Sequence, residues 1–462
     1  MAVEGSGPVE CRPLRPAVQA FPTEQFSPVP NHRPMLNTSR LAILFATVLV
    51  DMVGFGIVLP LLPSYAEEFG ASPFEVTLLI ASFSAMQFVA VPIWGRVSDR
   101  LGRRPFIIAG LFASAVSYLI FGFAESLAAL FVSRIAAGAA GGTIAVAQAY
   151  VADTTGPEDR AHGLGMLGAA SGLGVLVGPA IGGYFSEFGY SVPGFIAAGL
   201  CVVNGLAAIF YLPESRSLAP GSPTAPQAGS HTETRDRSQA EPPARAQAAT
   251  LRGWVITLVS FPFGLLLLVY FLSIMSFTAM TAVLALYAER AHGMDARDLG
   301  LVFAMAGGTT VVVRGLLVGR LTRRFGERWI VRAGTLVLAG SLAAIPLLPG
   351  AAAIFALVPF WALATGLTFP SLASLVSRET DAESQGAMLG GQQVVGGIGR
   401  VLGPVWAGLL FESVGIGTPF LAGAVLVAMA AAAATRIPPR RDGARRRTGA
   451  PPGVPVRPPG PR

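Results

Sequence analysis

One carboxylate and three arginines lie inside stretches of sequence that are otherwise apolar. Asp51 is the eleventh residue of the stretch 41–62, and Arg134, Arg314 and Arg400 lie in later stretches. A charge in hydrocarbon costs at least ~2.5–3.5 kcal/mol, so it is retained where it is paired or functional. Removal from water favours the neutral form of a carboxylic acid, which lets Asp51 take up and release a proton. The alternative is an acid held permanently in an ion pair with an arginine.

The arginines differ in how deeply they lie. Arg134 either takes part in this chemistry or snorkels to the nearer surface, and Arg314, five residues from Gly319, is placed to snorkel. Arg400 lies mid-span in GGIGRVLGP, too deep for easy snorkelling. It therefore pairs with an acid, caps a carbonyl or meets an anionic group of a substrate.

The composition places these residues in membrane-spanning helices. Of 462 residues, 52% are hydrophobic and 13% are charged, and the mean hydropathy is +0.59. A soluble domain has about 25% charged residues, so a water-soluble multidomain enzyme is excluded. About 20 apolar residues cross a bilayer as a helix, and the alternation typical of barrel strands is absent. Twelve spans are predicted at 41–62, 76–97, 105–124, 127–150, 163–185, 193–212, 256–287, 299–319, 329–348, 351–376, 386–411 and 416–435.

The predicted spans fall into two sets of six. The segment between them is rich in Pro, Ser, Ala and Gln, which is typical of a flexible linker. The Pro-rich ends of the chain are expected to be disordered. The first expected six-helix bundle covers 41–212 and the second covers 254–435, with the linker at 213–253 between them. An N-terminal tail is expected at 1–40 and an Arg- and Pro-rich tail at 436–462.

Charge placement predicts the orientation in the membrane. The chain has 33 basic and 26 acidic residues, a net charge of +7. Outside the spans, arginine gathers in the two tails, the linker and the loops after even-numbered spans, except for Arg290 and Arg297 between spans 7 and 8. The opposite loops carry acids such as Glu67, Glu187 and Glu412. Positive residues mark the cytoplasmic side. We expect an integral protein of the cell (inner or plasma) membrane with both termini cytoplasmic.

The two halves repeat each other. GRVSDRLGRR from Gly95 matches GRLTRRFGER from Gly319, an offset of 224, and Gly178-Pro179 matches Gly403-Pro404, an offset of 225. Parallel six-helix repeats imply a pseudo-two-fold axis along the membrane normal, and such bundles can rock about a central cavity. The predicted fold is an all-α polytopic membrane protein with twelve transmembrane helices in two pseudo-symmetric six-helix bundles.

Taken in order, these motifs resemble those of the major facilitator superfamily, and within it the twelve-span drug/proton antiporters of the tetracycline-efflux type. The resemblance runs from about 41 to 436. It implies the major facilitator fold and a part in proton coupling for Asp51 and Arg134. Its anchors are DMVGFGIVLPLLPSYAEEFG, GRVSDRLGRRP, RIAAGAAGGTIAVAQAYVAD, GLGVLVGPAIGG, LPES and SRETDAESQGAMLG.

GRVSDRLGRRP is a predicted conformational latch. Charge alone would support only a cytoplasmic anchor. In the family, the acid of this loop meets a helix end and nearby arginine in one conformational state; Asp99 matches that acid, and Asp153 is the expected partner of Arg103. The second half has Arg323 in place of Asp99, so an identical latch cannot form there, although Glu327 can partly substitute. The predicted latch residues are Gly95, Asp99, Arg100, Arg103, Arg104 and Asp153.

GLGVLVGPAIGG places three glycines four residues apart on one face of a helix. Pro179 removes a backbone hydrogen bond and favours a kink. Small-residue packing between helices explains the pattern on its own, and the resemblance places this stretch at the interface between the halves. A hinge or packing role is expected for Gly174, Gly178, Pro179, Gly182 and Gly183.

Polar residues within the spans either bond to neighbouring helices or line the cavity. The candidate cavity residues are Gln87, Gln148, Gln392 and Arg400. Tetracycline exporters carry acids in spans 3 and 9 and a histidine in span 8, where this chain has Ser117, Leu338 and Thr310. None of these can ligate a metal–drug chelate, so a multidrug-type substrate is favoured over tetracycline.

The predicted function is secondary active transport, not enzymatic catalysis. Proton-coupled efflux of drug-like or amphipathic small molecules by alternating access is favoured, since no GxxxxGK[ST] loop for ATP is present. A metabolite or sugar importer or facilitator of the same fold is the alternative, and a non-transporting receptor or scaffold is a remote one. The expected partners are a small-molecule substrate, protons and membrane lipid, and no nucleic acid is expected. The basic segment RDGARRRTGA (441–450) is a candidate site for anionic lipid headgroups. We expect a monomer with no metal or other cofactor.

Overall fold

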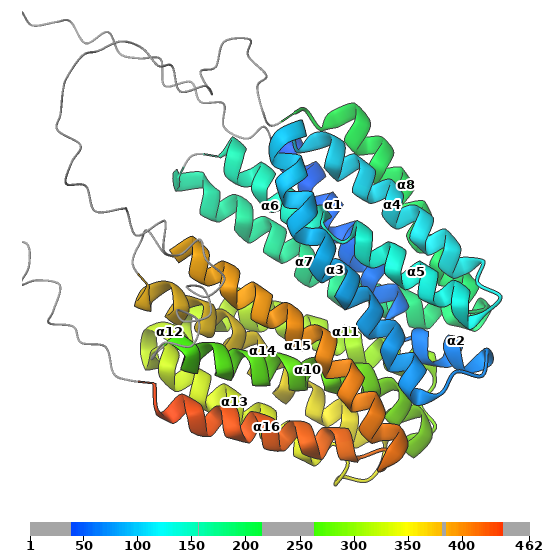
Figure 1. Ribbon diagram of the computed structural model, residues 1–462, viewed down its shortest axis with the longest axis vertical. Helices are drawn as coiled ribbons and strands as arrows, with labels where there is room; N and C mark the ends of the chain where they lie inside the picture. Colours follow the sequence, from blue (N-terminus) through cyan, green and yellow to red (C-terminus); the bar gives the residue numbers. More distant parts are fainter. Residues whose placement is uncertain (1–37, 156, 215–262, 381–384, 438–462) are drawn as a thin grey trace, which may run out of the picture. The chain divides into compact units, whose positions relative to one another are not determined.

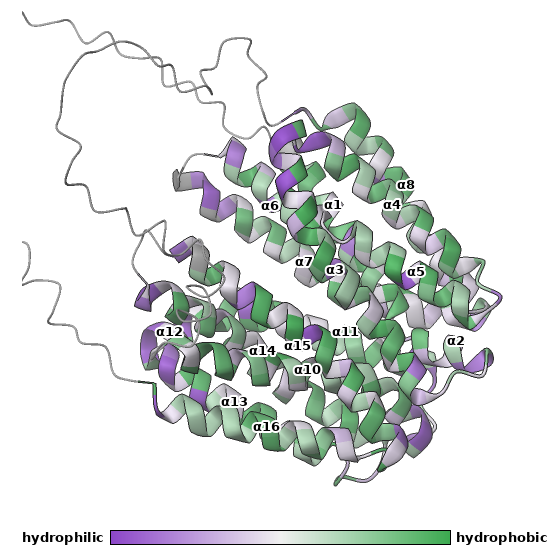
Figure 2. Ribbon diagram, in the orientation of Figure 1, coloured by the Kyte–Doolittle hydropathy of each residue, from purple (hydrophilic) through white to green (hydrophobic). Residues whose placement is uncertain are grey.

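Helices make up the regular structure of the computed structural model, which describes residues 38–155, 157–214, 263–380 and 385–437. The linker expected at 213–253 and the two expected tails lie almost entirely outside these residues. Eleven of the described helical segments are long and apolar enough to cross a membrane. Hydrophobic residues run along most of each helix, and hydrophilic residues gather near the helix ends (Figure 2). The chain is an integral membrane protein.

The helices fall into two bundles that follow one another along the chain (Figure 1). The first bundle consists of α1 (Thr38–Val58), α2 (Leu62–Glu68), α3 (Pro73–Leu101), α4 (Arg104–Gly122), α5 (Leu127–Ala140), α6 (Thr143–Thr154), α7 (Pro157–Phe185), the short η1 (Ser186–Phe188) and α8 (Ser191–Tyr211). The second consists of α10 (Phe263–His292), α11 (Ala296–Val312), the π-helical turn η2 (Val313–Leu317), α12 (Val318–Phe325), α13 (Glu327–Ala344), α14 (Ala351–Glu379), α15 (Gln385–Ser413) and α16 (Thr418–Thr435).

The packing of each bundle repeats that of the other. In the first bundle α1 packs on α7 and α4 packs on α8; in the second, α10 packs on α15 and α13 packs on α16. Two pairs of helices join the bundles, α7 with α11 and α3 with α15, and all belong to one compact unit. The duplication inferred from the sequence therefore extends to which helices touch.

The fourth expected span, 127–150, is not one continuous helix. It consists of α5 and α6, which are separated at Gly141 and Gly142. Glycine is a poor helix former, and two in succession permit the break. Side chains of α3 satisfy the freed backbone, since Trp94 Nε1 donates to Ala139 O at 2.8 Å and Gln87 Nε2 donates to Gly141 O at 3.5 Å. Non-helical backbone at membrane depth requires such partners.

The ninth expected span differs from the other eleven in its charge. Helix α13 replaces the expected 329–348, and it does not meet the criterion of length and composition for a membrane span. Glu327, Arg328 and Arg332 all lie in its first six residues. Arg332 thus joins the arginines inside expected spans. It donates from Nε and Nη2 to the last carbonyls of α16, at 3.1 Å and 3.0 Å, which neutralises the dipole of that helix end.

Candidate functional site

The two bundles are joined by ionic contacts at one end of the helices, here named the Glu67 end. Arg290 Nη2 of α10 lies 2.8 Å from Glu67 Oε1 of α2, and Arg297 Nη1 of α11 lies 2.9 Å from Glu187 Oε1. The backbone N–H of Phe74 donates to Glu412 Oε2 of α15 at 2.9 Å. Each contact crosses from one bundle to the other, so the bundles are closed against each other at this end.

Glycines allow close backbone approach at the Glu67 end. A Cβ on Gly183 of α7 would lie 2.8 Å from Ala296 O, and a Cβ on Gly300 of α11 would lie 2.6 Å from Pro179 O. Gly408 of α15 faces Thr77 of α3 in the same way. The absence of side chains at these positions lets both seams, α7 with α11 and α3 with α15, pack tightly.

The same seams are open at the opposite end, which holds Arg103 and is named the Arg103 end. Along α3 and α15, contact runs from Thr77 with Gly408 to Phe88 with Gly397; the same antiparallel spacing would place Gly95 opposite Gly390. A Cβ on either glycine would meet no atom within 4 Å. The seam therefore closes at one end and separates toward the other.

The second seam separates in the same way. Helices α7 and α11 are in contact from Gly183 with Gly300 to Gly172 with Val311, and the same spacing would place Gly168 opposite Gly315. Neither of these two glycines has an atom within 4 Å of a Cβ built on it. Arg314, exposed in the π-helical turn η2, adjoins this opening and has no ion pair within the described residues.

A central cavity of about 490 Å³ lies between the bundles, lined by α3, α6 and α15 and the break before α6. Its polar lining includes Gln87, Gln148, Gln393 and Arg400, and its apolar lining includes Phe88. Gln392, expected in the cavity, is instead only 4% exposed and does not line it. Neighbouring residues on a helix point about 100° apart, so only one of the two glutamines can face the opening.

The predicted proton site lies inside the first bundle and not in the cavity. Asp51 of α1 is 7% exposed, and the Ser114 hydroxyl of α4 is within hydrogen-bonding reach of its carboxylate. None of the ion pairs among the described residues includes Asp51. The carboxylate is thus held by a neutral donor, and a permanent pair with arginine is not its arrangement.

Tyr118 of α4 adjoins this site and is not among the residues predicted from the sequence. It lies within electrostatic range of both Asp51 and Arg134. Its hydroxyl packs on α1, because a Cβ on Gly54 would lie 2.6 Å from Tyr118 Oη. A tyrosine inside an apolar stretch was the available signal.

Arg134 of α5 does not snorkel to the surface. It is 4% exposed, and its guanidinium lies over the ring of Phe121, 5.3 Å from the centroid. Nε donates to Ser133 Oγ at 3.4 Å, while the buried Nη2 has no hydrogen-bond partner. An unpaired buried donor is energetically costly, and it distinguishes Arg134 from arginines whose guanidinium groups are satisfied.

The predicted latch residues form a cluster at the Arg103 end of the first bundle. Arg103 pairs with Asp99 and lies with Nε 2.9 Å from Asp153 Oδ2. Glu214 of LPES accepts from the backbone N–H of Arg103 at 2.8 Å and so caps α4, where its charge complements the helix dipole. Arg104 Nη2 donates to Ile209 O of α8. Arg100, the remaining latch residue, has no ion pair within the described part of the chain.

The second bundle contains the same junction with its charges reversed. Glu327 is the repeat equivalent of Arg103, and Arg378 is the equivalent of Asp153; their side chains lie 2.9 Å apart. Ser374 Oγ also donates to Glu327 Oε1, at 3.2 Å, and Arg328 pairs with Glu379 at 2.8 Å. Glu327 thus takes the place of a cation in the repeat.

The stretch GLGVLVGPAIGG contacts both bundles, and its glycine stripe is on the face turned toward the first bundle. Gly174, Gly178 and Gly182 face Met52, Val53 and Ile57 of α1, inside the first bundle. The interface between the bundles uses another face of α7, which carries Gly183. Pro179 lies within the helix, and its carbonyl faces Gly300.

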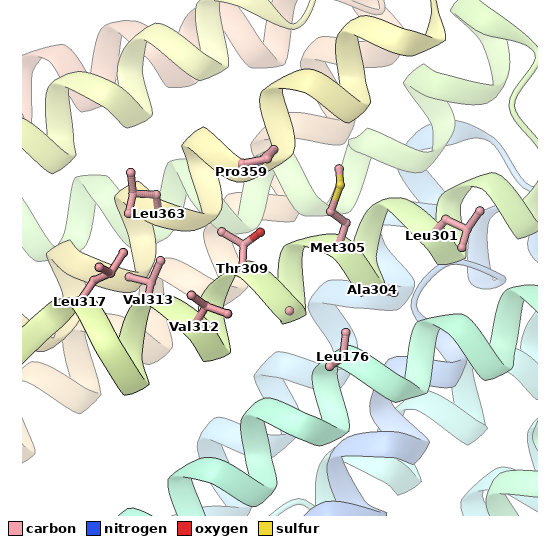
Figure 3. A pocket seen from close by; sticks show the side chains of 11 residues that line it. Leu176, Leu301, Ala304, Met305, Thr309, Val312, Val313, Leu317, Pro359 and Leu363 are labelled. Atoms are coloured by element: carbon pink, nitrogen blue, oxygen red, sulfur yellow. The ribbon is translucent and has the colours of Figure 1, made fainter.

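A second hollow of about 650 Å³ is apolar and is lined by α7 of the first bundle and by α11, η2 and α14 of the second (Figure 3). Leu176 of α7 faces side chains of α11 and α14 across it, among them Leu301, Val312 and Leu363. Thr309 is the one polar side chain of its lining. An open apolar groove on a membrane protein suits lipid chains and offers no group for chemistry.

Comparison with known proteins identifies the family of this chain. The family description that matches is Major Facilitator Superfamily, over residues 44–404 and again over 266–459. The tetracycline resistance protein, class B, of Escherichia coli is 28% identical over 82% of this chain and 89% of that protein. Multidrug resistance protein 2 of Bacillus subtilis (strain 168) is 27% identical over 83% of this chain and 92% of that protein.

Solved structures share the fold. The human organic anion transporter MFSD10 (TETRAN) has a TM-score of 0.63 at 22% identity, over 86% of this chain and 99% of that one. A bacterial homolog of the human lysosomal transporter Spinster, in an inward-facing and unoccupied conformation, has a TM-score of 0.65 at 16% identity, over 86% and 96% of the chains. The predicted all-α membrane fold is confirmed, with eleven of the twelve expected spans meeting the criterion among the described residues, and this chain belongs to the major facilitator superfamily of membrane transporters.

Proposed function

We propose that this transporter exports drug-like or amphipathic small molecules by alternating access, in exchange for protons. The observation that carries the proposal is the asymmetry of the two seams, which are packed at the Glu67 end and separated at the Arg103 end around a central cavity. The tetracycline and multidrug resistance proteins among its relatives support efflux as the direction.

The second conformation follows from the register of the seams. Closing the Arg103 end would bring Gly95 toward Gly390 and Gly168 toward Gly315, while the contacts at the Glu67 end separate. Glycine at all four positions leaves room for that approach. Packed interfaces have discrete arrangements, so the two ends alternate rather than open by degrees.

Proton coupling rests on the separation of Asp51 from the cavity. Protonation of a carboxylate held by Ser114, and not by a cation, changes the net charge buried in the first bundle. A gradient drives transport only when the two conformations differ in their affinity for the proton. Tyr118, within range of both Asp51 and Arg134, connects the acid to the buried cation.

The Arg103 end is proposed to be cytoplasmic. Arg103, Arg104, Arg328 and Arg378 lie there, whereas Glu67, Glu187 and Glu412 lie at the opposite end, as the positive-inside rule requires. The proposed location is the plasma membrane, with both termini in the cytoplasm, and the protein works as a monomer in contact with lipid. In this orientation the cavity is open to the cytoplasm, where an exported compound is collected.

Transport in proteoliposomes tests the proposal. A pH gradient is imposed across vesicles holding the purified protein, and a panel of lipophilic cations, organic anions, neutral drugs and sugars is added. Proton counterflow that depends on substrate and is abolished by Asp51→Asn supports antiport. Glu125→Gln, which neutralises an exposed acid between α4 and α5, is the matched control and is expected to retain counterflow.

Other outcomes would favour the alternatives. Equilibration of a sugar without a gradient, unaffected by Asp51→Asn, would indicate a facilitator. Co-directional movement of protons and substrate would indicate an importer. Protein that moves none of these compounds, while its two ends fail to change accessibility, would leave a receptor or scaffold as the better description.

A further inference from the structure

We propose that Arg400 forms an anion-binding subsite at the inner limit of the central cavity, and that the substrates are amphipathic organic anions with a carboxylate or sulfonate group. This inference rests on the proposed transport function and names its substrate class. Arg400 lines the cavity and is partly exposed to it. The subsite is the meeting point of this guanidinium with the polar side chains around it.

Arg400 has no counter-charge among the described residues. Of the cavity-lining residues, Arg400 alone is charged, and no carboxylate lines the cavity among the described residues. None of the ion pairs within the described residues includes it. A cation at membrane depth is costly unless it is paired or serves a ligand, and its guanidinium presents five donors suited to a carboxylate.

Arg400 differs in its surroundings from the other arginines that lie deep in the helices. Arg332 is satisfied by carbonyls at the end of α16, and Arg134 is enclosed against Phe121. Arg400 instead faces a space large enough for a ligand. Its described protein partner is the Tyr270 hydroxyl of α10, a neutral group that can accept a hydrogen bond and leaves the positive charge uncompensated.

Tyr270 also fixes where the guanidinium lies. The tyrosine ring packs against Gly396, one turn before Arg400, where a Cβ would lie 2.8 Å from the ring. On the seam, the spacing of α3 against α15 sets Arg400 level with Ala85, beside the lining residue Ser84 and deeper than the pair Phe88 and Gly397. An anion at Arg400 would therefore lie at the inner limit of the cavity, with the rest of the molecule toward the Arg103 end.

The remaining lining selects an amphipathic molecule. Phe88, Ile144 and Val394 provide apolar surface, while Gln87, Gln148 and Gln393 offer amide donors and acceptors. The cavity volume of about 490 Å³ is within the range of sites that hold drug-sized ligands. Aromatic and aliphatic contacts would hold the body of the compound, and the single cation would orient its anionic group.

Charge movement follows from this assignment. Export of an anion and entry of a proton carry current in the same direction, so an inside-negative potential would drive both. The potential should therefore accelerate transport of an anionic substrate more than transport of a neutral one at the same pH gradient.

Binding and transport of two dyes test the subsite. The anionic dye carboxyfluorescein and the cationic dye ethidium are titrated onto the full-length purified protein, with fluorescence polarisation as the readout, and their movement into proteoliposomes is measured. The variants are Arg400→Gln, Arg400→Lys and, as matched control, Arg320→Gln, whose guanidinium donates to Leu316 O of the preceding turn η2. Melting temperatures of all four proteins establish that each is folded.

We expect Arg400→Gln to weaken carboxyfluorescein binding about tenfold or more, the effect of losing a charged hydrogen bond, with ethidium binding unchanged or tighter. Arg400→Lys should recover part of the affinity, and Arg320→Gln should match the unaltered protein. Equal carboxyfluorescein affinity in Arg400→Gln and the unaltered protein would overturn the subsite. Binding of ethidium alone by the unaltered protein would overturn it as well.

The dyes also separate this inference from the transport proposal. If carboxyfluorescein binds in an Arg400-dependent manner but neither dye moves across the vesicle membrane, the anion subsite stands and the exporter proposal fails. If ethidium is moved by the proton gradient and carboxyfluorescein does not bind, the exporter stands and the anion subsite fails.

Discussion

The guanidinium of Arg290 lies 2.8 Å from the carboxylate of Glu67, a residue 223 positions earlier in the chain. This ion pair joins α10 of the second bundle to the end of α2 in the first. The side chains are 40% and 26% exposed, so solvent screens the interaction. Ser64 Oγ donates to the adjacent Glu289 at 3.4 Å. The contact is weak enough to break and re-form within a transport cycle, which suits a gate better than a permanent fastening.

Breaking this pair should favour opening of the Glu67 end. Arg290→Ala is expected to raise the labelling rate of a cysteine at Thr77, which is buried in this conformation, by about two- to fivefold, as for an exposed ion pair. The measurement uses Thr77→Cys in a background with Cys11 and Cys201 replaced. The exchange Glu67→Arg with Arg290→Glu should return the rate to its starting value, whereas Arg320→Ala should leave it unchanged. Equal labelling in all variants would show that the pair does not hold the gate.

Bulk at the open seam should stop the cycle without harming the fold. In this conformation the side chain introduced by Gly390→Val has open space around it, because a Cβ at Gly390 meets no atom within 4 Å. When the Arg103 end closes, the same side chain would obstruct the approach of α15 toward Gly95 of α3. We expect the transport rate to fall about tenfold or more, because the added side chain would destabilise the conformation that is closed at the Arg103 end by at least ~1.4 kcal/mol. The melting temperature should stay the same or rise slightly. Gly340→Val on α13, also in open space but away from the seams, is the control. Full transport by Gly390→Val would rule out closure at this pair.

The contact of Tyr118 with Gly54 should be sensitive to a single methyl group. Gly54→Ala places a Cβ 2.6 Å from Tyr118 Oη and displaces the tyrosine from the neighbourhood of Asp51, so proton-driven transport should fall several-fold. Gly199→Ala, which meets open space on α8, should be neutral or stabilising by about 0.5–1 kcal/mol through helix propensity. Tyr118→Phe separates hydroxyl chemistry from displacement, because it keeps the ring in place. Rates at two imposed pH gradients measure the effect, and an unaltered Tyr118→Phe would confine the role of Tyr118 to packing.

The charge-reversed junction of the second bundle predicts a stability change. Arg378→Gln removes the cation that faces Glu327, a residue only 8% exposed, and leaves Ser374 as its remaining donor. The expected loss in the free energy of unfolding is about 1–3 kcal/mol, the cost of leaving a buried carboxylate without its counter-charge. Thermal unfolding of the purified protein measures it. Glu327→Gln with Arg378→Gln removes both charges and should recover part of the loss. A double variant less stable than Arg378→Gln would contradict the pairing.

The sequence by itself determined the membrane architecture of this protein. Hydrophobic length and helical periodicity are local properties, and they predicted helices at all twelve positions, although they missed the break at Gly141 and the charged start of α13. The repeat of GRVSDRLGRR in GRLTRRFGER predicted the duplication. The same local signals identified Asp51 and Arg400 as charges set in apolar surroundings.

Only the tertiary structure decided how these residues are used. Whether Gln392 or Gln393 faces the cavity, and whether a glycine of α7 meets α1 or α11, depends on helix rotation and on contacts between distant segments. Apolar helices in a membrane can pack on several faces, so the pattern of each helix alone does not fix its neighbours. The proximity of Tyr118 to Asp51, the reversed pair Glu327 with Arg378, and the open seam at Gly95 and Gly390 all arise from that packing.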